Sequence, residues 1–177
     1  MANNTKRIIK KTFIKLLESQ ELSKITVKDI VQACDMNRNT FYYHFQDIPT
    51  LFEEIVKDIA DKMFSRLPDH FSTTDVALYA LKYVQLKKPI VYNIWHSSDR
   101  VYYEIHLMNI CEYAVNKFVD RLTKKKSISV ESASIISETL KCEFFGQIIQ
   151  WIHHEMEYDL VKHAKPICQA LEKIVEV

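Results

Sequence analysis

The chain of 177 residues is 47% hydrophobic and 27% charged with a net charge of +1, which is typical of a folded globular protein and excludes a disordered chain. It contains one glycine, Gly146, and four prolines, too few for the phosphate loops of nucleotide-binding folds or the many tight turns of β-sandwiches and barrels. An all-α fold is therefore expected.

The first predicted element is an amphipathic helix over residues 4–19, in which apolar residues recur at helical spacing. Its polar face is almost entirely basic and carries Lys6, Arg7, Lys10, Lys11 and Lys15. Residues 1–47 hold eight basic and five acidic side chains, a net charge of +3, whereas the remainder of the chain has a net charge of −2. This basic face either contacts a polyanion or is simply solvated.

Two short helices are predicted next, with a brief turn between them. Thr26 and Asp29 stand three residues apart, as in a capping box, and begin a helix of about two turns that ends near Cys34. Asn37 is the expected N-cap of a second short helix over residues 38–45. Two short helices with this spacing form the outline of a helix-turn-helix.

A longer helix is expected after Asp47, with Pro49 in its first turn, and it continues to about Arg66. The expected domain ranges are a helix-turn-helix domain, a linking helix and a C-terminal helical domain, at residues 1–47, 48–72 and 73–177. Further helices are predicted near residues 74–87, 89–97, 100–123, 131–156 and 159–175, separated by proline, serine and lysine clusters.

The region 24–55 resembles the DNA-binding domain of TetR-family transcriptional regulators. The likeness is most specific over residues 39–45, NTFYYHF, where that family usually has a small residue, Thr or Ser, an apolar residue, Tyr, any residue, His or Tyr, and Phe. The basic helix before this region and the long amphipathic helix after it also stand where the family has them. The resemblance implies an all-α regulator that binds double-stranded DNA.

A second stretch, FFGQIIQWI at residues 144–152, is similar to the glycine-then-tryptophan motif in the penultimate helix of one branch of the family. That branch includes regulators related to the dihydroxyacetone-kinase activators. In the family the last two helices of each subunit form a four-helix bundle with those of the partner, which implies a homodimer. We expect Gly146 at or near a helix crossing there, with Ile148, Ile149, Trp151 and Ile152 nearby. The alternative is that Gly146 allows a local kink or a small core contact.

The sequence departs from the family pattern at three positions. Asn39 stands where Gly or Pro is frequent. Asp35 replaces the usual glycine of the turn, although its short polar side chain allows the left-handed conformation. Ile48 replaces a common Lys that contacts DNA phosphate in the family, and its side chain has no charge to do so.

A helix in the major groove must read base edges while its neighbours hold phosphate. Arg38 suits guanine O6 and N7, and Asn39 suits adenine. By resemblance, Tyr42 and His44 hydrogen-bond phosphate. The predicted DNA-contacting set is Thr26, Lys28, Asn37, Arg38, Asn39, Thr40, Tyr42, Tyr43 and His44. Aromatic residues in a short helix are more often core, which is the prediction for Phe41 and Phe45; an exposed arginine such as Arg38 is also common as a solubilising residue.

The C-terminal region is rich in tyrosine and tryptophan, which bury area while keeping a hydrogen-bond donor and so suit a ligand pocket. Packing of the core and the dimer interface is the alternative explanation for each of them. The pocket candidates, chosen because helices of this region line the effector cavity where the family has one, are Trp95, Tyr102, His106, Phe144 and Phe145.

Catalytic and metal chemistry are not expected. Adjacent His153 and His154 point about 100° apart on a helix and do not easily share one ion. The sequence has no recognisable nucleophile or paired-carboxylate motif, so neither a cofactor nor a metal is predicted. The four cysteines never form a C-x-x-C pair and are expected to be reduced and mostly buried. No segment reads as a secretion signal or membrane span, so a cytoplasmic location is expected.

Taken together, the sequence predicts a homodimeric, TetR-like regulator that binds a pseudopalindromic operator. Repression is the common mode of the family, and release by a small-molecule effector is a frequent feature. The alternative is a helical protein-interaction module that kept the fold and lost specific DNA binding, which Ile48 and the small net charge would suit.

Overall fold

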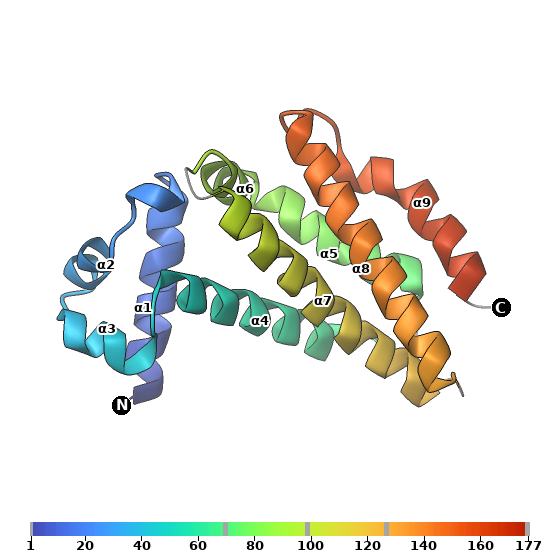
Figure 1. Ribbon diagram of the computed structural model, residues 1–177, viewed down its shortest axis with the longest axis horizontal. Helices are drawn as coiled ribbons and strands as arrows, with labels where there is room; N and C mark the ends of the chain where they lie inside the picture. The colour runs from blue at the N-terminus through green and yellow to red at the C-terminus, as the bar shows by residue number, and fades with distance from the viewer. Residues whose placement is uncertain (1, 69–70, 98–99, 126–127, 176–177) are drawn as a thin grey trace. The chain divides into compact units, whose positions relative to one another are not determined.

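The computed structural model describes residues 2–68, 71–97, 100–125 and 128–175, and in those ranges it consists of helices without a strand (Figure 1). The all-α prediction is therefore confirmed. Every helix expected from the sequence is present, and η1 is an addition that the pattern did not predict. In chain order the elements are α1 (Ala2–Leu17), the 3₁₀ helix η1 (Leu22–Lys24), α2 (Val27–Ala33), α3 (Arg38–His44), α4 (Ile48–Arg66), α5 (Thr73–Leu86), α6 (Lys88–Trp95), α7 (Arg100–Lys125), α8 (Val130–His153) and α9 (Leu160–Val175).

The chain divides into two compact units, each assembled from two segments. Unit one comprises residues 1–58 and 89–104, and unit two comprises residues 59–88 and 105–177. Both α4 and α7 begin in unit one and end in unit two, so the division falls within helices. The ranges expected from the sequence are contiguous, whereas the units are not.

The start of α2 is set by a capping box, as predicted. The backbone N–H of Asp29 donates to the Thr26 hydroxyl at 3.3 Å, and the Asp29 carboxylate accepts from the Thr26 backbone N–H at 2.9 Å. The Thr26 hydroxyl also donates to this carboxylate at 2.6 Å, and that bond is the main cause that lowers the pKa of Asp29. The backbone N–H groups of Thr26 and Asp29, which have no partner within the helix, therefore gain a local one.

The turn between α2 and α3 is closed by Asp35, whose φ of 53° confirms the expected left-handed conformation. The N–H of Met36 then reaches back to the carbonyl of Val31 at 2.8 Å, as in a Schellman motif. Asn37 caps α3 by accepting from the N–H of Thr40 at 2.9 Å, which confirms the predicted N-cap. Backbone hydrogen bonds and the side chain of Asn37 thus fix the conformation of the turn between α2 and α3.

The core of unit one lies between one face of α1 and the helices α2, α3 and α4. On α1 this face carries Ile9, Phe13 and Leu17, all without solvent exposure. The C-terminal carbonyl of α1, at Leu17, accepts from the amide of Asn93 on α6 at 2.9 Å. The other buried apolar residues of this unit are Leu22, Ile25, Ile30, Val31, Phe41, Phe45, Leu51, Ile55 and Ile90. Phe41 and Phe45 are thereby confirmed as core.

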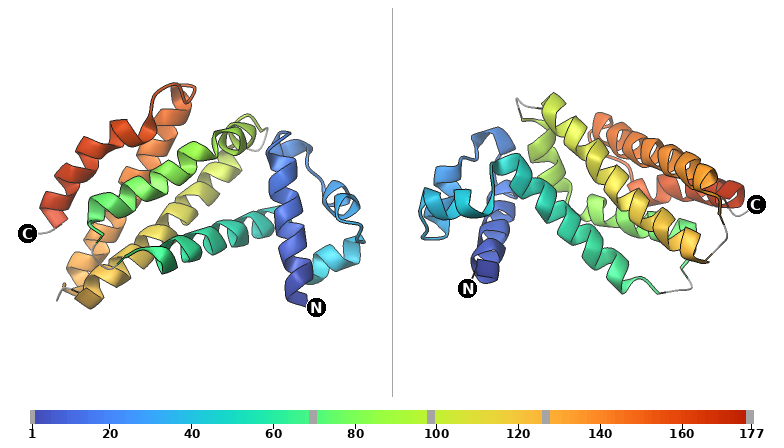
Figure 2. Two further views of the ribbon diagram at one scale, coloured as in Figure 1. Left: turned by 180° about the vertical axis from the view of Figure 1, so that it is seen from behind. Right: turned by 60° about the horizontal axis from the view of Figure 1, so that its bottom comes forward.

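Unit two is a bundle in which α9 packs along α5 and α8, and α8 and α9 lie side by side in every view (Figure 2). One of its core clusters joins α5, α7 and α8 to Leu67, directly after α4. The buried members of this cluster are Leu67, Val76, Val115, Phe118, Val119 and Leu140. No helix among the described residues is long and apolar enough to cross a bilayer.

A carboxylate on α9 fastens the start of α5. Glu172 accepts from the Thr74 backbone N–H at 3.2 Å and from the Thr74 hydroxyl at 2.7 Å. Burial acts to raise the pKa of Glu172, but these bonds outweigh it and the pKa is lowered. A negative charge at a helix N-terminus is also favourable. The bond therefore links two helices that are far apart in sequence.

Replacement of Glu172 by Gln is expected to lower the free energy of unfolding by about 1 kcal/mol at neutral pH, because charge-assisted hydrogen bonds at a partly exposed site are lost. A carboxyl whose pKa is depressed in the folded state stabilises it above the unfolded pKa, near 4.5 for Glu, and this contribution is lost as pH falls through the folded pKa. Urea unfolding of the native protein and Glu172→Gln at a series of decreasing pH values should show the difference between their free energies of unfolding shrinking as the pH falls. Glu157→Gln, at an exposed position, is the control, and a difference independent of pH would contradict the prediction.

The end of α8 differs from the expected helix over 131–156. Glu155 and Met156 both have positive φ, 53° and 56°, so the helix stops at His153. The N–H of Met156 bonds to the Trp151 carbonyl at 2.9 Å, and the Trp151 indole N–H donates to the Tyr158 carbonyl at 2.9 Å. Neither residue is a glycine, which is why the sequence pattern continues the helix one turn too far.

Candidate nucleic-acid interface

The short helix α3 has one buried face and one exposed face. Phe41 is completely buried and Phe45, its C-cap, is nearly so, whereas Tyr42 is 56% exposed and Tyr43 80% exposed. Arg38 and Asn39 are also exposed. The buried phenylalanines therefore anchor the helix and leave a polar and aromatic surface formed by Arg38, Asn39, Tyr42 and Tyr43.

His44 is half-buried, and its ring is edge-on to that of Tyr43 and tilted against that of Phe45. The centroid of the imidazole lies 5.0 Å from the ring of Tyr43 and 6.3 Å from that of Phe45. The ring of Tyr42 stands edge-on to that of Phe41, with the ring centroids 5.6 Å apart. The exposed ring of Tyr42 thus packs against a buried ring, and that of Tyr43 against the half-buried His44.

Three of the predicted DNA-contacting side chains are already engaged in local structure. The side-chain oxygen of Asn37 accepts from both the N–H and the hydroxyl of Thr40, the latter at 3.1 Å. Thr26 is held in the capping box with Asp29. Lys28, the second residue of α2, is exposed. The structure therefore leaves Lys28, Arg38, Asn39, Tyr42 and Tyr43 as the most accessible members of the set.

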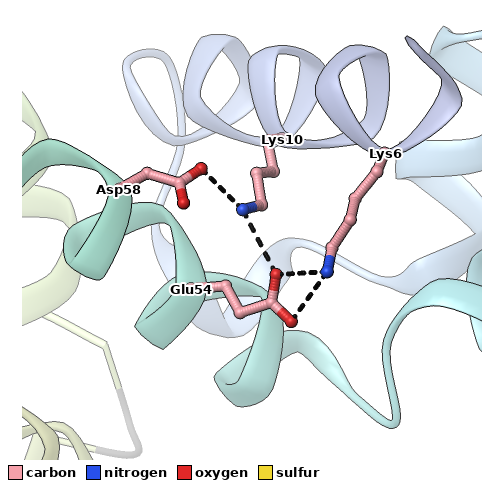
Figure 3. Close-up of polar contacts among 4 residues, drawn as sticks. All are labelled: Lys6, Lys10, Glu54 and Asp58. Carbon is pink, nitrogen blue, oxygen red and sulfur yellow. Dashed lines mark hydrogen bonds and ion pairs between the residues drawn. The ribbon is translucent and has the colours of Figure 1, made fainter. Parts of the chain in front are cut away.

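The basic face of α1 is divided in two by its contacts (Figure 3). Lys6 lies 2.7 Å from one carboxylate oxygen of Glu54 on α4 and 3.0 Å from the other. Lys10 lies 3.2 Å from Glu54 and 2.7 Å from Asp58. Lys6 and Lys10 are therefore neither solvated without a partner nor available to bind phosphate, because both are paired with carboxylates of α4.

The remaining basic residues of α1 are exposed. Arg7 donates to the side chain of Asn4 at 2.9 Å, within the same helix. Lys11 and Lys15 follow at intervals of one turn on the side away from the buried face. Sequence reasoning treated all five basic residues as one face; the signal that separates them is the pair of carboxylates, Glu54 and Asp58, one turn apart on α4.

The carboxylate of Glu54 is held ionised by its two lysine partners. Burial raises its pKa, but hydrogen bonds from Lys6 and Lys10, with the charges of these lysines, outweigh that effect and lower the pKa. Only 32% of the Glu54 side chain and 15% of the Lys10 side chain are exposed, so solvent screens these pairs less than it screens a surface pair.

The candidate pocket residues are distributed over both units. Trp95 belongs to unit one, whereas His106, Phe144 and Phe145 belong to unit two; all four are half-buried. Phe144 packs against the core cluster of α5, α7 and α8. The side chain of Tyr102 lies outside the described part of the structure.

The residues predicted at a dimer interface fall into two groups. Ile148, Trp151 and Ile152 are at most 5% exposed within the single chain, so they have little surface left to offer a partner. Gly146 is exposed and Ile149 is half-buried. A Cβ atom added at Gly146 would meet nothing within 4 Å, so no packing inside the chain requires a glycine there.

The described residues contain no group of three or more His, Cys, Asp or Glu side chains that could hold a metal ion. All four cysteines are free thiols; Cys111 and Cys168 are buried, Cys34 is half-buried and Cys142 is exposed. Burial raises the pKa of the Cys111 thiol to about 12. This thiol is therefore protonated and unreactive at neutral pH.

Comparison with known proteins gives matches to regulators along most of the chain. A model described as bacterial regulatory proteins, tetR family, matches residues 12–55, and one described as transcriptional regulator C-terminal region matches residues 72–173. The chain is 30% identical over 80 residues to the HTH-type dhaKLM operon transcriptional activator DhaS of Lactococcus lactis subsp. lactis (strain IL1403), covering 45% of this chain and 43% of DhaS.

A second curated relative is the uncharacterized HTH-type transcriptional regulator YxbF of Bacillus subtilis (strain 168), 24% identical over 75 residues, which are 42% of this chain and 20% of YxbF. The chain thus matches less than half the length of these two relatives. A solved structure, named dihydroxyacetone kinase operon activator DhaS, has the same fold, with a TM-score of 0.62 and 22% identity over 96% of this chain and 97% of that one. The matching proteins are transcriptional regulators and not enzymes, and the C-terminal model spans more than half of the sequence: the chain belongs to the TetR family of transcriptional regulators.

Proposed function

We propose that this TetR-family regulator binds a pseudopalindromic operator as a homodimer. In this proposal residues 1–47 contact DNA, residues 48–72 connect the two functions, and residues 73–177 form the dimer and receive a small-molecule effector. The observation that carries it is the exposed surface of α3, where Tyr42 and Tyr43 face solvent beside the fully buried Phe41. A helix anchored on one face and polar on the other is suited to the major groove.

Roles within this surface follow from side-chain chemistry. Arg38 and Asn39, at the start of α3, would read guanine and adenine edges. Tyr42 and His44 would hold phosphates, and Lys28 on α2 would fix the register of the helix on the duplex. The two α3 helices of a dimer would occupy successive major grooves about 34–36 Å apart.

The dimer interface is proposed on the outward face of α8, with α9 beside it. A glycine in the middle of a helix costs about 0.5–1 kcal/mol relative to alanine. The open space above Gly146 indicates that any packing benefit comes from outside this chain, which a second copy would supply. Sedimentation as a concentration-independent monomer would contradict the dimer.

The direction of regulation is proposed as repression, the common mode of the family, with an effector that favours a conformation of lower DNA affinity. The relative DhaS is named an activator, so the opposite sign is the alternative. A reporter gene behind the operator distinguishes the two, since deletion of the regulator raises expression under repression and lowers it under activation.

The test of DNA binding is fluorescence anisotropy with duplex DNA from upstream of the protein's own gene, beside scrambled DNA, at several salt concentrations. Nanomolar binding that prefers the upstream fragment supports the proposal. Equal, weak and salt-sensitive binding to both fragments calls for selection from fragmented genomic DNA, and failure to enrich any sequence supports the protein-interaction module instead.

Replacement of Arg38 by Ala is expected to weaken operator binding by about 1–3 kcal/mol and to relax the preference at one base pair, because a bidentate contact to guanine is lost. Lys28→Gln is the matched comparison: it should weaken binding to all sequences alike and reduce the slope of log K against log salt by about 0.9 for each lost phosphate contact. The same loss of affinity on operator and scrambled DNA in both variants would assign Arg38 to phosphate.

A further inference from the structure

Lys6 on α1 joins three elements of unit one. Its Nζ lies 2.7 Å and 3.0 Å from the two carboxylate oxygens of Glu54 on α4. The same Nζ lies 5.2 Å from the centre of the ring of Phe45, the buried C-cap of α3. An ammonium group over an aromatic face is attracted by its quadrupole. Lys6 therefore links the end of the DNA-facing helix to α4.

Lys10 extends this link by one helical turn. It contacts both Glu54 and Asp58, at 3.2 Å and 2.7 Å, so two lysines at i and i+4 on α1 face two carboxylates at i and i+4 on α4 (Figure 3). Glu54 is the shared member, because it bonds to both lysines. The four side chains form one network and not two separate pairs.

These contacts argue against a phosphate-binding role for the two lysines. Each would have to leave a carboxylate that is already ionised and partly shielded from solvent, and Glu54 would be left without its cations beside a polyanion. The exposed Lys11, on the same helix, has no such restriction. The contacts of α1 thus distinguish Lys6 and Lys10, which are bonded to α4, from the exposed Lys11.

We propose that Glu54 is a positioning residue for DNA binding: through Lys6 and Lys10 it fixes α1 and the C-terminal end of α3 against α4, and these two lysines do not contact DNA. This inference rests on the proposed operator binding. Of the basic residues of α1, it assigns only Lys6 and Lys10 to α4.

Glu54→Gln distinguishes positioning from phosphate contact by the sign of its effect. If the lysines were phosphate ligands, loss of the carboxylate would release them and operator affinity would stay the same or rise. With Glu54 as a positioning residue, affinity falls about fivefold, as expected for a partly exposed charge network, and the salt slope stays that of the native protein. Fluorescence anisotropy is measured under conditions in which circular dichroism shows that the native protein and Glu54→Gln are both folded.

A double-mutant cycle with Lys6→Gln gives the second readout. The losses from Lys6→Gln and Glu54→Gln should be less than additive, because both break one contact, and neither should reduce the salt slope. Additive losses, or a slope reduced by about 0.9 for each lost contact in Lys6→Gln, would overturn the inference. Lys11→Gln is the matched control, with the same charge change on the same helix and no effect on the cycle with Glu54→Gln.

Hydrogen exchange of the free protein separates failure of this inference from failure of the proposed function. The Phe45 N–H, bonded to the Phe41 carbonyl at 2.9 Å, reports the end of α3. Glu54→Gln should speed its exchange relative to Lys11→Gln, whether or not the native protein selects an operator. Equal exchange in the two variants overturns the positioning role, whereas absence of native operator preference overturns only the proposed function.

Discussion

Replacement of Trp151 by Ala is expected to lower the free energy of unfolding of unit two by about 3–5 kcal/mol, the range for truncation of a buried aromatic residue. Trp151 is 1% exposed on α8, and its indole N–H donates to the Tyr158 carbonyl in the turn before α9. The substitution leaves a cavity and a carbonyl without its donor, so packing and turn geometry are weakened together.

Urea unfolding followed by circular dichroism measures this loss. Trp151→Phe is the control: it keeps an aromatic ring but not the donor, and a loss of about 1–2 kcal/mol is expected from the hydrogen bond and the smaller volume. Gln150→Ala, at an exposed neighbouring position, should change stability by less than about 0.5 kcal/mol. A similar small loss in all three variants would show that the turn does not depend on the indole.

Replacement of Phe41 by Ala is expected to destabilise unit one by about 3–5 kcal/mol, because its ring is completely buried and lies 5.7 Å from that of Phe45. Helix α3 has only seven residues and owes its stability to packing more than to helix propensity. The loss should appear as increased hydrogen exchange across α2 and α3, and operator affinity should fall with it.

The neighbouring Tyr42→Ala gives the opposite pattern and serves as the control. Tyr42 is 56% exposed, so its truncation should change stability by less than about 1 kcal/mol while weakening DNA binding. Stability losses of similar size for the two variants would contradict the two-faced character of α3. Equal DNA affinity in native protein and Tyr42→Ala would remove this tyrosine from the interface.

Local features of the fold could be predicted from the sequence because short-range chemistry determines them. The capping box at Thr26, the N-cap at Asn37 and the left-handed Asp35 all depend on side chains within three residues of the backbone they serve. The alternation of buried and exposed aromatic residues in α3 follows from helical periodicity. In these regions local preference and global packing agree.

Other features depend on contacts that no local pattern encodes. The bond between Lys6 and Glu54 joins residues 48 apart, and that between Thr74 and Glu172 joins residues 98 apart. The end of α8 lies at non-glycine residues in the left-handed region, so the usual stop signal is absent. Burial of Trp151 inside its own chain also depends on the turn that follows, which the periodicity of α8 does not show.

The two-segment construction of unit one limits how a DNA-binding head could be exchanged between regulators. A chimera that took only residues 1–58 would leave the Leu17 carbonyl without the Asn93 donor and would omit Ile90, a buried residue of the same unit. Grafting must therefore transfer residues 89–104 as well, which makes three junctions in the chain, after residues 58, 88 and 104. Recombination at a single crossover would separate parts that fold together, so shuffled regulators of this kind should lose stability before they lose operator preference.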